Sequence, residues 1–138
     1  MLIEVYIFNA TSIHEEQTHD ETTLPRFPSV EFVKKEIAVT VPNIFWIDET
    51  TAQINNSDFQ GQIILSDRTD FRIIYFRIAG GLDPFKVLLD LCVRNNWTSY
   101  TPENGHFLDL KMDTLKYWQE YQTYKGFIND VFNKSKSN

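Results

Sequence analysis

The sequence is poor in the residues that cross-link, break or loosen a chain. Its 138 residues include one cysteine, five glycines and five prolines. Because Cys92 has no partner in the chain, an internal disulfide is excluded, and a reducing compartment fits best. The low glycine and proline content leaves little room for linkers or low-complexity sequence. We therefore expect residues 1–138 to form a single domain that can bury a core without a metal or a disulfide.

Long hydrophobic runs are missing as well. No apolar stretch approaches the ~20 residues that a membrane-spanning helix requires. The opening segment MLIEVYIFNA carries Glu4 and has neither a basic start nor a small-residue cleavage site, so a signal peptide is not expected. The sequence thus predicts a cytoplasmic protein without a membrane partner.

Positive charge is also scarce. The chain has 13 Lys and Arg against 19 Asp and Glu, a net charge of −6, which disfavours non-specific nucleic-acid binding. An RNA-binding sheet would interleave exposed aromatic and basic residues. The segment from Phe71 to Arg77 has both types, but the acidic total argues against nucleic acid as a partner. The charge suits a basic protein partner, although simple solubility is the favoured explanation, since many cytosolic domains are mildly acidic.

Motifs for catalysis and nucleotide binding are absent or incomplete. Gly80-Gly81 lacks the context of a phosphate-binding loop and indicates a turn from strand to helix. Cys92 and His106 have the residue types of a nucleophile and its base, but Cys92 shares an apolar stripe with Leu88, which favours a buried thiol. Carboxylates near predicted strand ends favour turn formation over acid–base chemistry. These are Asp48, Glu49, Asp58, Asp67 and Asp70.

One segment combines imidazole and carboxylate groups that could bind a divalent cation. Its members are His14, Glu15, Glu16, His19, Asp20 and Glu21. The two histidines are five residues apart, which does not place them on one helical face. A solvated acidic loop is therefore the favoured interpretation, and no metal or other cofactor is predicted.

Alternating β-branched and aromatic residues predict the strands. They cover residues 2–8, 44–47, 62–65 and 71–78, with further extended segments at 97–100 and 106–110. Residues 50–54 are expected to continue the second strand after a kink at Asp48-Glu49. Residues 9–26 show no periodic pattern and predict a long loop. Both faces of 71–78 are apolar, which is typical of a central strand covered by helices on at least one side.

Three helices are predicted. They cover residues 29–41, 84–95 and 114–132. Pro42 ends the first, because the residue before a proline avoids the α region. Asp83 as N-cap and Pro84 at the first helical position begin the second. Asp113 is expected to cap the third.

The last helix is unusually aromatic. Its aromatic residues are Tyr117, Trp118, Tyr121, Tyr124 and Phe127. They go nearly round the helix, so not all of them can pack inward, and tyrosine and tryptophan are common interface anchors. They indicate a binding surface or a contact between two copies of the chain, or they cover the open face of the sheet. A homodimer is left open.

The order of elements, β-α-β-β-β-α-β-α, predicts an α+β fold. Two helices joined by an antiparallel meander favour a mostly antiparallel sheet with both helices on one face. The specific prediction is a ferredoxin-like, split βαβ arrangement with a C-terminal helix added.

A resemblance rests on the end of the second helix and the extended segment after it. Residues Asn95-Asn96-Trp97-Thr98-Ser99-Tyr100 and Glu103-Asn104-Gly105-His106-Phe107-Leu108-Asp109-Leu110 carry it. This run resembles the "helix, Asn-Gly-Trp, strand, Thr-Gly-Glu-Phe, Leu-Asp-Leu" ending of small bacterial proteins of uncharacterised function, several of them associated with toxin–immunity loci. Shorter similarities extend over residues 27–110. The chain departs from the pattern at Asn96, where glycine is expected, and at His106, where glutamate is expected. The resemblance implies a ferredoxin-like α+β fold and a protein-binding role, with no catalytic residues to carry over.

The sequence therefore predicts a non-enzymatic bacterial protein-binding domain, in its most specific form an immunity-type inhibitor of a basic partner such as a toxin. The candidate partner-binding residues are Glu15, Glu16, Asp20, Glu21, Tyr117, Tyr121 and Tyr124. The alternative is a small-ligand binding or regulatory domain, with a pocket between sheet and helices near Trp46, Tyr75 and Trp97.

Overall fold

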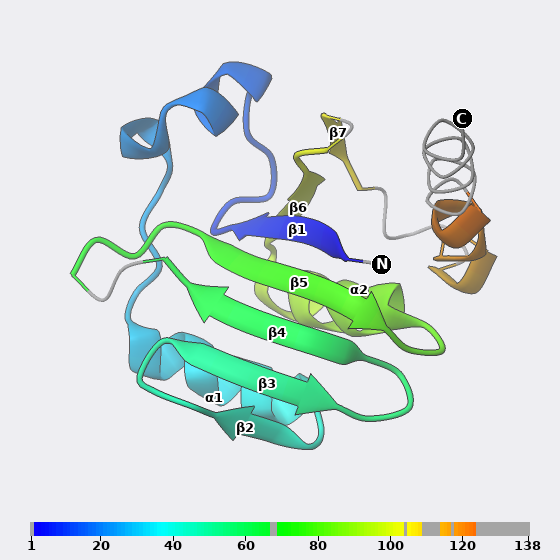
Figure 1. Ribbon diagram of the computed structural model, residues 1–138. Helices are drawn as coiled ribbons and strands as arrows, with labels where there is room; N and C mark the ends of the chain where they lie inside the picture. The colour runs from blue at the N-terminus through cyan, green and yellow to red at the C-terminus, as the bar shows by residue number, and fades with distance from the viewer. Residues whose placement is uncertain (1, 67–68, 104, 109–113, 117, 124–138) are drawn as a thin grey trace, which may run out of the picture.

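A seven-stranded antiparallel sheet forms the framework of the protein (Figure 1). The computed structural model describes residues 2–66, 69–103, 105–108, 114–116 and 118–123. The strands are β1 (Ile3–Phe8), β2 (Ile44–Trp46), β3 (Thr51–Asn55), β4 (Gln60–Leu65), β5 (Ile74–Gly80), β6 (Thr98–Thr101) and β7 (His106–Phe107). Their order across the sheet is β2-β3-β4-β5-β1-β6-β7, and every neighbouring pair is antiparallel.

The first strand of the chain lies inside the sheet. β1 pairs with β5 on one side, where Ile3 is opposite Ile78, and with β6 on the other, where Tyr6 is opposite Tyr100. Side chains alternate between the two faces of a strand. Ile3 and Ile7 are fully buried toward the helices, whereas Tyr6 lies on the other face.

Two helices, α1 (Val30–Thr40) and α2 (Pro84–Asn95), cover one face of the sheet, behind it in Figure 1. The predicted signals begin and end them. The Ser29 hydroxyl accepts a hydrogen bond from the Phe32 amide at 3.0 Å, and the Asp83 carboxylate accepts one from the Lys86 amide at 3.2 Å. Asn96 ends α2 in the left-handed conformation, with φ of 56°, which asparagine tolerates better than most residues.

The predicted α+β class, with an antiparallel sheet and both helices on one face, is confirmed. The full ferredoxin-like arrangement is not confirmed, because that arrangement has four strands and this sheet has seven. β5 and β6 run in the same direction on either side of β1 and are connected by α2.

The prediction for residues 44–54 is wrong in one respect. Instead of one kinked strand, the segment forms the antiparallel hairpin β2–β3. The Asp48 carboxylate accepts hydrogen bonds from the amides of Thr50 at 2.9 Å and Thr51 at 2.8 Å, which closes a tight turn. The boundaries of β5 also differ from the predicted range of 71–78. The strand begins at Ile74 and continues through Ala79 to Gly80.

The core is divided by the sheet into two clusters. The larger lies between sheet and helices. The smaller lies on the opposite face and contains Phe8, Leu24, Ile73 and Tyr100, with Tyr6, Ile13 and Tyr75 packed against it. Residues 13–24, which we call the acidic segment, cover this second cluster. They were predicted as structureless but contain two short 3-10 helices, η1 (Glu15–His19) and η2 (Glu21–Thr23).

Part of the predicted last helix is described. Residues 114–116 and 118–123 are helical, and Trp118 packs edge-on against Phe85 of α2 with ring centroids 5.7 Å apart. The Trp118 indole nitrogen donates to the Gly81 carbonyl at 3.1 Å. The predicted cap at Asp113 and the continuation to residue 132 lie outside the described residues. No helix in the described part of the chain is long and apolar enough to cross a membrane.

Candidate functional site

The acidic segment is fixed to the sheet by one arginine. Arg72 has a side chain only 13% exposed, and its Nη1 donates to the carbonyls of Thr22 at 2.6 Å and Leu24 at 2.8 Å. Its Nε donates to the Asp70 carboxylate at 2.8 Å. A guanidinium presents several donors in a fixed plane, so one buried side chain can hold two neighbouring backbone groups.

Short local hydrogen bonds shape the segment itself. The His14 amide donates to the Gln17 side chain at 2.9 Å, and the Asp20 carboxylate accepts from the Thr22 hydroxyl at 2.6 Å. These bonds involve the side chains of Gln17, Thr22 and Asp20, and neither of them uses the carboxylate of a glutamate. All four predicted acidic residues, Glu15, Glu16, Asp20 and Glu21, are exposed. No cationic side chain among the described residues forms an ion pair with Glu15, Glu16 or Glu21.

Beside the segment, the sheet presents a half-buried polar and aromatic surface. We call it the open face, and it consists of Glu4, Tyr6, Gln62, Ile64, Tyr75 and Arg77. The rings of Tyr6 and Tyr75 meet edge-on with centroids 4.9 Å apart. Arg77 pairs with Glu4 across the two strands at 3.3 Å.

Nearby carboxylates raise the pKa values of both tyrosines in this pair. The pKa of Tyr75 is raised above 10.0, first by desolvation and then by the charge of Glu21. The pKa of Tyr6 is raised by desolvation and by Glu4, partly offset by Arg77. Both phenols therefore stay protonated at neutral pH and can donate hydrogen bonds. The surface offers carboxylates, phenols and aromatic rings, which are the groups that receive lysine and arginine side chains.

The structure describes the surroundings of the His14–Glu21 cluster and of Cys92, which were the candidates for metal binding and for catalysis. Within the described residues, no three His, Cys, Asp or Glu side chains are arranged to hold a metal ion, and the His14–Glu21 cluster is no exception. Cys92 is 5% exposed, and burial raises its pKa to about 12, against the opposing effect of the Ser99 hydroxyl. A buried, neutral thiol is a poor nucleophile. The side chain of His106 is not among those described.

Two of the carboxylates near strand ends, Asp48 and Asp70, act in a turn and in ion pairs respectively. Asp48 closes the β2–β3 hairpin through its bonds to two backbone amides. Asp70 pairs with both Arg26 and Arg72 at 2.8 Å. The hydrogen bond from Arg72, with desolvation opposing it and the charges of Arg72 and Arg26 reinforcing it, lowers the pKa of Asp70 below 3.8. Asp67 lies outside the described residues.

Of the aromatic residues considered for partner binding, those that the structure describes are buried, and the others lie outside the described residues. Tyr121 is 7% exposed and packs against Phe85 with centroids 5.9 Å apart, so little of its surface is available to a partner. Tyr117 and Tyr124 lie outside the described residues. Phe71 and Phe76, two of the aromatic residues that an RNA-binding sheet would have exposed, are both buried in the main core.

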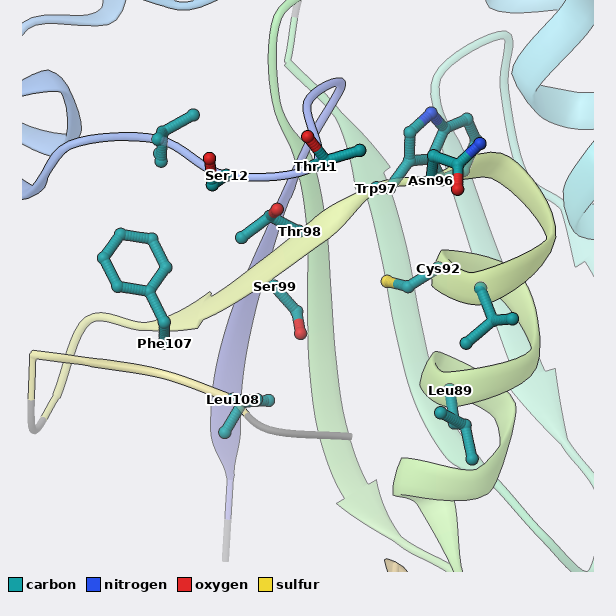
Figure 2. Close-up of a pocket in the computed structure, with 12 residues that line it drawn as sticks. Thr11, Ser12, Leu89, Cys92, Asn96, Trp97, Thr98, Ser99, Phe107 and Leu108 are labelled. Carbon is teal, nitrogen blue, oxygen red and sulfur yellow. The ribbon is translucent and has the colours of Figure 1, made fainter. Parts of the chain in front are cut away.

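A cavity of about 610 Å³ lies at the edge of the sheet (Figure 2). Among its lining residues are Leu89 and Cys92 of α2, Trp97 and Ser99 around the start of β6, and Phe107 and Leu108. Residues 11–13 also line it, and Thr11 and Ser12 lie at the top of Figure 2. Of the three aromatic residues predicted to share a pocket, only Trp97 contributes. The Lys34 ammonium lies over the Trp46 ring, with its nitrogen 4.5 Å from the ring centroid, and Tyr75 is on the open face.

Sequence reasoning located the acidic side chains but missed the residues that position them. Arg72 reaches partners about fifty positions earlier in the chain, and no local pattern marks such a contact. The lining of the cavity likewise comes from three separate segments. Of the lining residues, only Trp97 had been placed near a pocket from the sequence.

The chain matches no protein-family model, and no curated protein or solved structure is significantly similar to it.

Proposed function

We propose that this protein acts by binding a basic protein partner and carries no catalytic activity. The observation that carries the proposal is the acidic segment, in which Glu15, Glu16, Asp20 and Glu21 are all exposed. The segment is held in place by Arg72 rather than left to move freely. A charged surface that is already ordered loses less conformational entropy on binding than a mobile loop does.

The open face extends this surface. Tyr6 and Tyr75 lie beside Glu4 and Glu21, so an incoming lysine or arginine finds both a carboxylate and an aromatic ring. Complementary charge of this kind accelerates association and selects the partner. Tyrosines supply rigid contact area, which is typical of interface centres.

The most specific form of the proposal is a bacterial, cytoplasmic immunity-type inhibitor that covers a basic toxin. The similarity of residues 95–110 to proteins from toxin–immunity loci and the net charge of −6 support it. In this form the inhibitor needs no reaction chemistry, because blocking access to the toxin is enough.

The test begins with the tagged protein purified from its native host and eluted over a salt gradient. We expect a stoichiometric basic protein that salt releases, because exposed charge pairs weaken as ionic strength rises. Its association rate is then measured with purified components. Glu15→Lys/Glu16→Lys should slow association by about tenfold at low salt.

A matched control separates local from overall charge. Asp90→Lys/Glu120→Lys makes the same change in net charge at exposed positions on α2 and the last helix. This variant should leave association nearly unchanged. Equal effects of the two pairs would show that the acidic segment is not the contact. The absence of any stoichiometric basic partner would refute the proposal as a whole.

A further inference from the structure

The edge cavity has the dimensions of a small-molecule site. Its volume of about 610 Å³ falls within the ~300–1,000 Å³ range of ligand pockets in proteins. It lies between α2 and β6, and of the acidic segment only Ile13, at its start, is among the described lining residues. In Figure 2 the side chains of Leu89, Cys92 and Leu108 point into the same space from both sides.

The lining is uncharged. None of the twelve described residues around the cavity is Asp, Glu, Lys, Arg or His. The Cys92 thiol is also neutral, because burial holds its pKa at about 12. A charged ligand group inside this cavity would have no compensating partner, and an unpaired buried charge is costly.

One polar atom in the cavity lacks a partner. The Ser99 hydroxyl is buried, with 3% of the residue exposed, and it makes no hydrogen bond with any described group. The Cys92 thiol lies close by, and the Ser99 hydroxyl acts to lower the pKa of that thiol against the larger, raising effect of burial. Figure 2 shows both side chains directed into the space between β6 and α2. Buried hydroxyls are normally satisfied, so this atom indicates a missing acceptor or donor.

We propose that the cavity binds a neutral, largely apolar small molecule whose single carbonyl or hydroxyl oxygen faces Ser99. The apolar body of the ligand lies against Leu89, Trp97 and Leu108. Its oxygen accepts a hydrogen bond from the Ser99 hydroxyl. The mouth of the cavity is bordered by Val93, which is 62% exposed.

The proposal does not rest on the charges of the acidic segment, and the experiment uses the full chain with two fluorescent probes. The first, 6-propionyl-2-dimethylaminonaphthalene, is neutral and apolar and carries one ketone oxygen. The second, N-phenyl-1-naphthylamine, is of similar character but has no oxygen. Both change emission in apolar surroundings, so titration of each gives a dissociation constant.

Two valine substitutions form a matched pair. Val93→Trp places an indole over the mouth of the cavity, whereas Val39→Trp makes the same change on α1, at a position 57% exposed and outside the lining. Both sites are exposed on helices, so both variants should fold, as circular dichroism will check. We expect Val93→Trp to weaken the ketone probe by at least about tenfold and Val39→Trp to leave its affinity unchanged.

Ser99→Ala tests the hydrogen bond. Loss of one such bond should weaken the ketone probe about fivefold to tenfold and leave the oxygen-free probe unaffected. Equal losses for both probes would refute the assignment of Ser99 as the polar contact. Non-saturable binding of both probes, or equal affinity of the Val93→Trp and Val39→Trp variants, would refute the site itself.

Discussion

Replacing Arg72 with methionine tests whether one side chain holds the acidic segment in place. Methionine keeps most of the apolar stem but removes the guanidinium, so packing is largely preserved while the donors are lost. The hydrogen bonds to the Thr22 and Leu24 carbonyls, at 2.6 and 2.8 Å, disappear. The segment retains the packing of Leu24 and the bond from Asn9 to the Arg26 carbonyl. We therefore expect local opening and not global unfolding.

The magnitude is set by the two bonds. A hydrogen bond to a charged group contributes roughly 1.5–3 kcal/mol, and the bond to Thr22 is exposed enough for water to replace part of it. The segment should therefore lose about 2–4 kcal/mol of local stability, a large share of the ~5–15 kcal/mol typical of a whole domain. The Asp70 pair is exposed, and we assign it no share.

Amide hydrogen exchange measures this local stability directly. The amides of Thr23 and Leu24 bond within the segment, to the carbonyls of Asp20 and Glu21. Their protection should fall by about 30- to 800-fold, since each 1.4 kcal/mol is a factor of ten. Protection of the β1 and β5 amides should not change.

Arg77→Met is the matched control. It removes an arginine from the same strand region, but Arg77 pairs only with Glu4 on the open face among the contacts described for it. It should leave protection of the acidic segment intact. Equal loss in both variants, or loss spread over the whole sheet in Arg72→Met, would refute the view that Arg72 is a local clamp.

Two further predictions concern buried side chains. Cys92 should react with thiol reagents at neutral pH far more slowly than the same cysteine in the unfolded chain, because burial keeps its thiol protonated, and labelling rates of the folded and the denatured protein will show this. Its unfolded pKa is 9.0 and its folded pKa about 12, so stability should fall as pH rises above 9, by up to about 1.4 kcal/mol per pH unit. Cys92→Ala should remove this part of the slope, and an unchanged slope would contradict the assignment. Trp118→Phe should cost about 1 kcal/mol through the lost bond to Gly81, and Trp118→Ala about 3–5 kcal/mol in urea unfolding. Wild-type stability in Trp118→Ala would mean that the last helix is not anchored there.

Local signals in the sequence were reliable guides to local structure. Ser29, Asp83 and Pro84 predicted the helix starts because caps act within one turn. The apolar residues on both faces of the strand around Ile74 predicted its central position, because the alternation of side chains along a strand is also a local pattern. The sequence analysis placed a kink at Asp48, whereas the structure has a hairpin turn there. The Asp48 carboxylate accepts hydrogen bonds from the amides two and three residues later in the chain, and such bonds are compatible with a kink as well as with a turn.

The site was predictable only in part. Exposure of the acidic residues follows from their own polarity, so the sequence indicated it. The Arg72 clamp depends on how distant segments cross, which no periodicity encodes. The meeting of Cys92 with Ser99 depends on how the chain turns back from α2 into β6, which the pattern of neither element specifies. The pocket predicted around Trp46, Tyr75 and Trp97 failed because these residues lie on different parts of the sheet.

The position of β1 between β5 and β6 also sets the order in which the chain can fold. β2 to β5 pair with their sequence neighbours, and such local contacts form early. β1 must wait for partners such as Ile78 and Tyr100. At ribosomal rates of ~5–20 residues per second, that delay is on the order of 5–20 s. During synthesis the apolar face of β1 therefore stays without its final partners, and chaperones should find the nascent chain through this first strand.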